Sequence, residues 1–261
     1  TMNVSVAEKQ LVVVLGMHRS GTSLLTKGLE SCGVSLQMVD EGAEDNPSDG
    51  AKAIVDYGIN SEDTVLGITA SSSTPFVYGA MEKAKELGFE VIHQKNKGEG
   101  NACRVGTDAT ESDFVIFFSP DGNDEPEDIP QLIQKTKEGY DVVHISRFGK
   151  NSVSDDANLL ERFGNNMFTF LVNAFFGGNY TDALNGFRII KRSIWDKLKT
   201  DAQYLNIEQQ TCIRLAKLKI PIYEIEGNEP ARIGGERKMR PLTTGAQLSY
   251  QILKEFAYWK F

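Results

Sequence analysis

The sequence predicts an α/β fold, Rossmann-like, with a mostly parallel sheet and helices on both of its faces. Short apolar runs alternate with helical patterns of about a dozen residues, which is typical of βαβ units. The first run, LVVVL at 11–15, is apolar throughout, as expected of a strand buried on both faces. The other expected strands are 64–68, 89–93, 113–118, 141–145 and 220–225. A chain of 261 residues is long enough for one such domain with a sizeable core.

The expected helices lie between these strands. A proline at an early position opens a helix over 75–87, and another helix spans 126–138. Residues 158–176 carry apolar side chains at helical spacing and should pack on the core as an amphipathic helix. These side chains are Leu159, Leu160, Phe163, Met167, Phe170, Leu171 and Phe175. The amphipathic segment 248–261 carries aromatic residues and lysines, which fits packing on the core or peripheral membrane contact.

Composition and charge exclude several classes of protein. The net charge of −8 argues against nucleic acid as the main partner, because phosphate binding at scale needs a basic excess. The cysteines Cys32, Cys103 and Cys212 lack metal-ligand spacing and are expected to be buried thiols in a reducing compartment. No run approaches the roughly 18 apolar residues of a membrane span, and a signal peptide is not recognisable. We therefore expect a cytoplasmic protein, with peripheral contact at the inner face of a membrane left open.

The stretch 113–123, DFVIFFSPDGN, is the most informative part of the chain. An expected strand runs directly into a turn of small residues that carries one carboxylate, Asp121. Open α/β sheets bind their ligands at the carboxyl ends of such strands. Asp121 is therefore a candidate metal ligand or phosphate-handling group. A turn-forming aspartate before Gly122 is the alternative.

Together with three neighbouring segments, this stretch resembles a family 2 glycosyltransferase of the GT-A fold, the group that includes polyprenyl-phosphate sugar synthases. The segments are NKGEGNACRVG (96–106), PEDIPQLI (126–133) and TDALNGFR (181–188). The resemblance covers about 88–258. It implies transfer of a sugar from a nucleotide-diphosphate donor to a polyprenyl-phosphate or glycan acceptor. It also implies Mg²⁺ or Mn²⁺ to neutralise the leaving diphosphate.

The resemblance assigns roles to residues that face the donor. The family's Asp-x-Asp metal motif reads Ser119-Pro120-Asp121 here, so one carboxylate is missing and metal binding should be weaker. Lys97 matches the donor-side turn, and Arg147 falls at a position near the diphosphate. The alternatives are a solvated loop lysine and a structural ion pair.

A basic loop and an acceptor-side turn complete the expected site. Residues 232–240 resemble the family's phosphate-contacting loop, with cations that include Arg232 and Lys238. Asp182 and Arg188 match the acceptor-side loop, and Glu208 stands near the acceptor as a candidate general base. The candidate catalytic residues are thus Asp121, Asp182 and Glu208. For residues 232–240 the alternative is a solvated charge run. For Arg188 it is a structural ion pair, and for Glu208 it is a solvated glutamate on a helix.

The N-terminal residues carry a different resemblance. Residues 12–36, VVVLGMHRSGTSLLTKGLESCGVSL, look like the strand, phosphate loop and helix of a PAPS-dependent sulfotransferase. In such a loop, glycines let backbone N–H groups close round a phosphate at a helix N-terminus, and arginine and hydroxyl groups add bonds. The candidate ligands are Gly16, Arg19, Ser20, Gly21, Thr22 and Ser23. Thr22 stands where a Walker A loop has lysine, and the sulfotransferase's second nucleotide-contact region and base are not recognisable.

Residues 43–88 are similar to the sugar-phosphate isomerase (SIS) domain of N-acetylmuramic acid 6-phosphate etherases. Four hydroxyl residues precede an expected helix and could hold a phosphate, namely Ser71, Ser72, Ser73 and Thr74. That family has a glycine and an arginine among these positions, and the rest of its catalytic domain is absent. Phosphate binding is therefore expected here without etherase chemistry.

These resemblances divide the chain into a P-loop-like segment (1–40), a SIS-like segment (41–88) and a glycosyltransferase-like segment (89–261), within one continuous α/β domain. Three families in one chain suggest a chimera built by fragment recombination. The alternative is a divergent glycosyltransferase, because phosphate loops converge on glycine and hydroxyl residues. Besides the glycosyltransferase, three functions stay open: a phosphate or nucleotide binder without catalysis, a designed chimeric protein without activity, and a PAPS-dependent sulfotransferase.

Overall fold

The computed structural model describes residues 48, 82–83, 85–86, 95–96, 98–118, 124–155, 157–230 and 241–260. Residues 82–83 and 85–86 are helical, within the helix expected at 75–87. The strands expected at 11–15, 64–68 and 89–93 lie outside the described residues.

Four strands of the described chain form one sheet in the order β1-β3-β2-β4. Their bounds are Phe114–Phe117 (β1), Val142–Ser146 (β2), Arg188–Lys191 (β3) and Tyr223–Glu226 (β4). β2 runs parallel to β4, whereas β3 lies between β1 and β2 and runs antiparallel to both. Three strands therefore point the same way, and the described sheet is mixed because the chain turns back at 177–187 before it enters β3.

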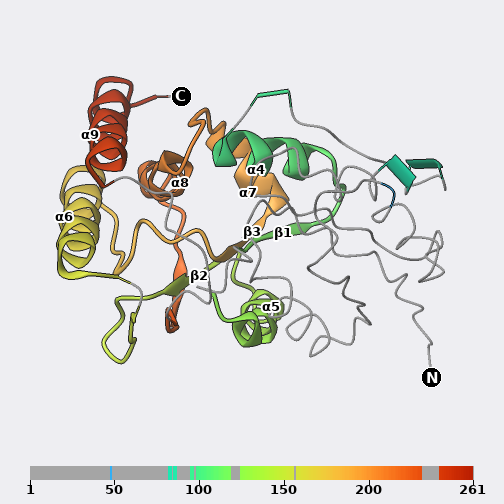
Figure 1. The fold of residues 1–261 in the computed structure, drawn as a ribbon, viewed down its shortest axis with the longest axis horizontal. Coiled ribbons are helices and arrows are strands. Elements are labelled where there is room, and N and C mark those ends of the chain that lie inside the picture. The colour runs from blue at the N-terminus through green and yellow to red at the C-terminus, as the bar shows by residue number, and fades with distance from the viewer. Residues whose placement is uncertain are drawn as a thin grey trace.

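Helices cover both faces of the sheet, as the sequence predicts (Figure 1). Alternate side chains of β1 point to opposite faces, since successive residues of a strand do so. Ile116 packs with α5 (Ile129–Lys137), which follows the short 3₁₀ helix η2 (Pro126–Asp128). Phe117 packs on the other face, where its ring centroid lies 4.8 Å from that of Trp195. That second face carries the helices α4 (Glu99–Asp108), α7 (Arg192–Leu198) and α8 (Asn206–Lys217).

Helix α6 (Leu159–Phe176) forms where the sequence predicts it, but it buries a different face. Asn158 caps it with a capping box to Glu161. Its buried residues are Asn165, Phe168, Thr169, Val172 and Phe176. The predicted apolar stripe is instead mostly exposed, with Leu159 at 86%, Phe163 at 65% and Phe170 at 67%. The prediction that this stripe packs on the core is therefore wrong. The buried face carries Phe168, Val172 and Phe176, which pack in one hydrophobic cluster. Thr169 on the same face accepts the Ala183 N–H at its Oγ1 (3.0 Å).

Helix α9 (Pro241–Ala257) packs against α6 and α8 through Leu248 and Ile252, so core packing is confirmed for this segment. A buried carboxylate fixes it, because Glu255 Oε1 lies 2.7 Å from Arg214 Nη2 and Oε2 lies 2.6 Å from Lys217 Nζ. None of the described helices is long and apolar enough to cross a membrane.

Gly98 begins α4 in a conformation that only glycine adopts without strain, with φ +117°. A Cβ there would lie 2.1 Å from the carbonyl oxygen of Gln203. We expect Gly98→Ala to lower the free energy of unfolding by about 1–3 kcal/mol, the usual cost of a strained backbone. Urea denaturation measures this loss. Gly164→Ala within α6 is the matched control, because a Cβ there meets nothing within 4 Å and alanine favours a helix. An equal loss in both variants would contradict the explanation.

Candidate active site

The carboxyl ends of β1, β2 and β4 and the start of β3 meet at one edge of the sheet. Phe117 and His144 both lie opposite Arg188, and Ser146 lies opposite Glu226. Arg147 follows β2 directly, and Asp121 follows Phe117 by four positions. This is the edge at which open α/β sheets bind ligands. The fold therefore brings residues that are far apart in the sequence to one place.

Arg147 is held between two carboxylates at this edge. Its Nε lies 2.8 Å from Asp182 Oδ2, and its Nη1 lies 2.9 Å from Glu229 Oε1. The Asp182 side chain is fully buried and also accepts the Leu184 N–H at 3.1 Å. Burial by itself would raise the pKa of Asp182, but the charge and hydrogen bonds of Arg147 bring that pKa below its usual value. Arg147 thus joins the loops that follow β2 and β4 and the one that precedes β3.

Arg188 and Glu208 form a second buried pair. Arg188 is 1% exposed, and its Nη2 lies 2.6 Å from Glu208 Oε2. The same guanidinium donates to the carbonyl oxygen of Asn185 and reaches Cys212 Sγ at 3.7 Å. Burial raises the pKa of Glu208, although Arg188 opposes that shift. The alternative of a solvated helical glutamate is therefore wrong.

Gly186 lets the acceptor-side turn approach Glu208 closely. A Cβ on Gly186 would lie 3.1 Å from Glu208 Oε1, the oxygen that does not contact Arg188. The turn predicted from the sequence thus contacts the predicted base directly. The other expected site residues lie outside the described residues. They are Asp121, Lys97, Arg232 and Lys238, the phosphate-loop residues 16 and 19–23, and the hydroxyl residues 71–74.

Solved structures share this fold. Glucosyl-3-phosphoglycerate synthase from Mycobacterium tuberculosis, in complex with Mn²⁺ and UDP-glucose, matches with a TM-score of 0.56 at 17% identity, over 96% of this chain and 80% of that one. A mycobacterial protein matches with a TM-score of 0.59 at 14% identity, over 96% and 76%. The fold is that of a GT-A glycosyltransferase.

Sequence comparisons relate parts of this chain to two groups of known proteins. Residues 71–199 match the model of Glycosyl transferase family 2. Glycosyltransferase AglJ from Haloferax volcanii is 24% identical over 206 residues, which are 78% of this chain and 66% of that protein. N-acetylmuramic acid 6-phosphate etherase from Clostridioides difficile is 54% identical over 52 residues, 20% of this chain and 17% of the etherase. The glycosyltransferase and etherase resemblances are therefore both supported, and the sulfotransferase resemblance stays a prediction.

The described residues of the GT-A domain do not by themselves form a metal site. They contain no group of three or more histidine, cysteine, aspartate or glutamate side chains placed to hold an ion. Asp182, Glu208 and Glu229 at the site edge are each bound to an arginine.

His144 supports the site from within the sheet, and it belongs to none of the sequence motifs. Its Nε2 lies 2.7 Å from the carbonyl oxygen of Asp182, to which it must donate. Burial, with the nearby charge of Arg188, lowers the pKa of His144 to about 3, so the ring is neutral. The signal available in the sequence is a polar residue inside the apolar run DVVHIS. His144 therefore positions the Asp182 loop and does not titrate near neutral pH.

Asp128 is a second group that the sequence analysis does not single out. It stands at the N-cap position of α5 without a side-chain capping bond, and it is only 7% exposed. Its Oδ2 has no hydrogen-bond partner among the described residues. Burial, with the charges of Glu125 and Glu127, raises the pKa of Asp128 from 3.8 to about 6. The folded protein therefore holds this proton more tightly than the unfolded chain does. The acidic run that follows Asp121 in the sequence is the available signal.

We expect Asp128→Asn to raise the free energy of unfolding at pH 7 by up to about 3 kcal/mol, at 1.36 kcal/mol per pKa unit. Because the folded pKa is raised, the contribution of Asp128 to stability is present below pH 3.8 and is lost as the pH rises to about 6. Denaturation from pH 4 to 8 should show that wild type loses this stability while Asp128→Asn does not. A gain that is the same at every pH would contradict the titration.

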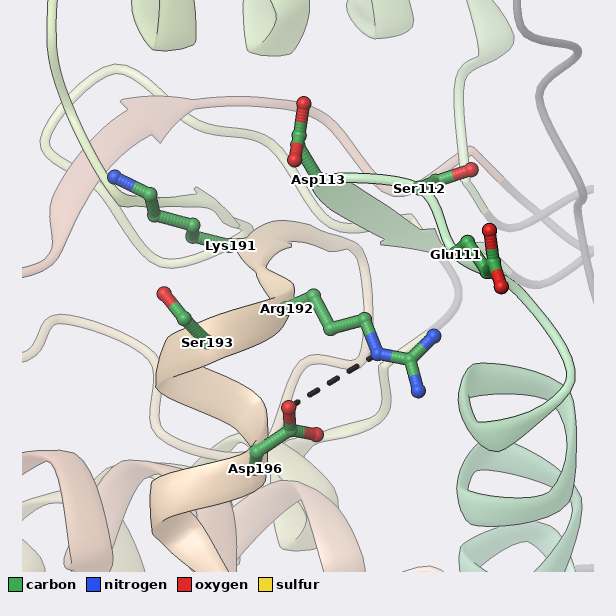
Figure 2. Close-up of a pocket in the computed structure, with 7 residues that line it drawn as sticks. All are labelled: Glu111, Ser112, Asp113, Lys191, Arg192, Ser193 and Asp196. Atoms are coloured by element: carbon green, nitrogen blue, oxygen red, sulfur yellow. Dashed lines mark ion pairs between the residues drawn. The ribbon is translucent and has the colours of Figure 1, made fainter.

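A shallow charged cavity lies at the opposite edge of the sheet, where β1 begins and β3 ends (Figure 2). It has a volume of about 230 Å³, and two of its lining residues form an ion pair, with Arg192 Nε 4.0 Å from Asp196 Oδ2. Its lining residues are Glu111, Ser112, Asp113, Lys191, Arg192, Ser193 and Asp196. None of the predicted site residues lines it, so it is separate from the candidate active site.

Proposed function

We propose that this protein transfers a sugar from a nucleotide-diphosphate donor to an acceptor. The observation that carries the proposal is the meeting of Arg147, Asp182, Arg188 and Glu208 at the carboxyl end of β1, the strand that leads to Asp121. The GT-A fold and the family 2 match support it. The mycobacterial synthase with this fold was solved with UDP-glucose, and in another structure with phosphoglyceric acid.

The charges at the site edge suggest how the donor is held. The two arginines at this edge, Arg147 and Arg188, are already paired with carboxylates, so they leave little positive charge for a diphosphate. We assign that task to Lys97, Arg232 and Lys238, with a Mg²⁺ or Mn²⁺ ion on Asp121. The ion would neutralise the leaving diphosphate when bound. Arg147 acts by holding the surrounding loops in place.

The two described carboxylates suit different roles. Asp182 has a lowered pKa and accepts three hydrogen bonds from Arg147, so it is a weak base and positions the loop. Glu208 has a raised pKa and one oxygen turned toward Gly186, so it is the better proton acceptor. In the proposed step, an acceptor hydroxyl oxygen bonds to the sugar carbon, the carbon–oxygen bond to the diphosphate breaks, and Glu208 takes the hydroxyl proton. An acceptor that is already an anionic phosphate, such as a polyprenyl phosphate, would need no base.

A thermal-shift panel tests this function. UDP, GDP and PAP are each added with Mn²⁺ and with EDTA to wild type and to Asp121→Ala. A ligand at a hundred times its dissociation constant stabilises the folded state by about 2.7 kcal/mol, which is measurable. The proposal expects a metal-dependent UDP or GDP shift that Asp121→Ala abolishes. A nucleotide-dependent shift that is the same in EDTA and in Asp121→Ala would overturn the proposal.

A phosphate or nucleotide binder without catalysis is the second candidate. The observation that favours it is Ser119, which replaces the first carboxylate of the family's metal motif. This candidate expects a PAP or phosphate shift that persists in EDTA and disappears in Arg19→Ala. The same PAP measurements test the sulfotransferase alternative. A binder without catalysis fits a chain in which segments 1–40, 41–88 and 89–261 were joined by recombination into one domain.

A further inference from the structure

Helices α6 and α9 together expose an apolar surface, which we call the α6–α9 face. Ring contacts join the two helices, since the centroids of Phe175 and Phe256 are 6.0 Å apart. Figure 1 shows both helices at the same end of the molecule. The face consists of Leu159, Leu160, Phe163, Met167, Phe170 and Phe175 from α6 and of Tyr250, Leu253, Phe256 and Trp259 from α9 and the residues after it.

The size of the α6–α9 face is that of a protein interface. Its ten side chains are between 38% and 86% exposed. Large apolar and aromatic side chains each bury about 150–250 Å² when covered, so the face exposes on the order of 1,000 Å². The largest apolar patch on a typical monomer is about 300–600 Å². Each partner in a standard interface contributes about 800 Å². The face therefore has the area that a stable dimer needs.

The charges around the face favour a protein surface over an anionic bilayer. The charged residues of α6 are Glu161 and Arg162, both half-buried. In α9, Lys254 lies 2.5 Å from Asp201 and Glu255 is buried against Lys217, and one exposed lysine, Lys260, follows Trp259. Membrane-binding helices instead carry clustered lysine and arginine, and anionic lipids would repel a chain of net charge −8. An uncharged face allows two copies of this acidic chain to meet without repulsion between them at the contact.

The sequence of α6 is also suited to self-association. Phe163 and Phe170 stand at equal distances on either side of the exposed pair Asn166–Met167. In two antiparallel α6 helices related by a two-fold axis at that pair, Phe163 of one copy meets Phe170 of the other. Asn166 then meets its own copy, and two amides can hydrogen-bond to each other. A buried asparagine at a helix interface is a known means of fixing register.

We propose that the α6–α9 face is the interface of a homodimer in which the α6 helices of two copies pack antiparallel about a two-fold axis near Asn166. Such an interface is isologous, so the same side chains contribute from both copies. The proposal is independent of the glycosyltransferase function, since it concerns side chains that do not line the site.

Sedimentation velocity over a range of protein concentrations tests the dimer. Wild type should reach the dimer mass, and Phe163→Glu and Phe170→Glu should each raise the dimer dissociation constant by at least about 100-fold, because each places unpaired charges in the contact. Both positions are exposed, so the variants should fold. Leu218→Glu, at an exposed residue at the end of α8 and off the face, is the matched control and should stay dimeric.

Cysteine cross-linking tests the symmetry. Asn166→Cys should form a disulfide-linked dimer under mild oxidation, and Lys137→Cys at the end of α5 should not, because a disulfide needs Cα atoms within about 7 Å. A wild type that is monomeric at every concentration would overturn the proposal, as would a dimer that both glutamate variants leave intact. Monomers that float with phosphatidylcholine vesicles, and lose this in Phe170→Glu, would show instead that the face binds lipid.

Discussion

Arg188→Met is expected to lower the free energy of unfolding by about 3–5 kcal/mol, because it leaves the buried carboxylate of Glu208 without its partner. The pair is 2.6 Å apart, and the two side chains are 1% and 9% exposed, so water cannot replace the lost contact. The methionine has a similar volume, which keeps the loss of packing small. Urea denaturation at pH 7 measures the effect.

The double variant Arg188→Met/Glu208→Leu is the control for this prediction. It removes both charges, so most of the lost stability should return, and the coupling in the double-mutant cycle should be large. The folded pKa of Glu208 is raised, and more so without Arg188. The penalty in Arg188→Met should therefore shrink as the pH falls from the raised folded pKa toward 4.5, and it should be smallest below 4.5, where the unfolded chain binds this proton as well. A penalty that is below about 1 kcal/mol would mean that the pair is screened like a surface pair.

Glu208→Gln separates the catalytic role of Glu208 from its structural role. Glutamine keeps the shape and can still accept a hydrogen bond from Arg188, but it cannot take a proton. It also leaves the buried charge of Arg188 without its counter-ion, so the variant should be less stable than wild type, and kcat is compared at a temperature at which both proteins are folded. A general base contributes about 10²–10⁴-fold to the rate. We expect a fall in kcat of that size for a hydroxyl acceptor, with donor binding unchanged in the thermal-shift panel. Unchanged kcat in a folded Glu208→Gln protein would remove Glu208 from the proposed step.

Helices α5 and α6 could be predicted from the sequence because their signals are local. The capping box of Asn158 and Glu161 marks the start of α6, and proline and acidic residues mark the start of α5. β3 gives no such signal, since its four residues RIIK run into α7 without a turn residue between them. Its position between β1 and β2 depends on pairing with strands more than forty residues away in the chain.

Burial was the part of the fold that local patterns could not predict. The sequence of α8, NIEQQTCIRLAK, has few apolar residues, yet every residue from Ile207 to Ala216 is buried. The reason is its central place, because α4, α6, α7 and α9 all pack against it. Glu208 is buried for this reason. In α6 the opposite occurs, and a strongly apolar stripe is left exposed.

The structure describes four of the residues that the glycosyltransferase resemblance singles out, Arg147, Asp182, Arg188 and Glu208, and it adds how they are paired. Asp182 and Arg147 come from a resemblance that gives them separate roles, whereas here they form one buried ion pair with Glu229. Glu229 lies in no motif of the sequence analysis. Its role follows only from the parallel pairing of β2 with β4, which places the residues after both strands side by side.

Arg147→Met is expected to lower the free energy of unfolding by at least as much as Arg188→Met does. It leaves two buried carboxylates, Asp182 and Glu229, without their partner, and one broken buried pair usually costs about 3–5 kcal/mol. The loops after β2 and β4 and before β3 meet at this arginine. Its removal should therefore also abolish the nucleotide-dependent thermal shift, since residues 231–240 follow β4 and Glu229 directly in the chain.

The matched variant Asp182→Asn should lose less unfolding free energy than Arg147→Met at pH 7, because Arg147 keeps Glu229 and the asparagine oxygen can still accept a hydrogen bond.

The pH dependence of the stability of Asp182→Asn identifies the ion pair. The folded pKa of Asp182 is lowered, so its contribution to stability is fully present above the unfolded value of 3.8 and is lost as the pH falls through the folded pKa. The difference in unfolding free energy between wild type and Asp182→Asn should therefore be constant from pH 5 to 7 and disappear in stronger acid. A difference that persists at low pH would mean that Asp182 acts through its shape and neutral hydrogen bonds. Arg147 would then be held mainly by Glu229.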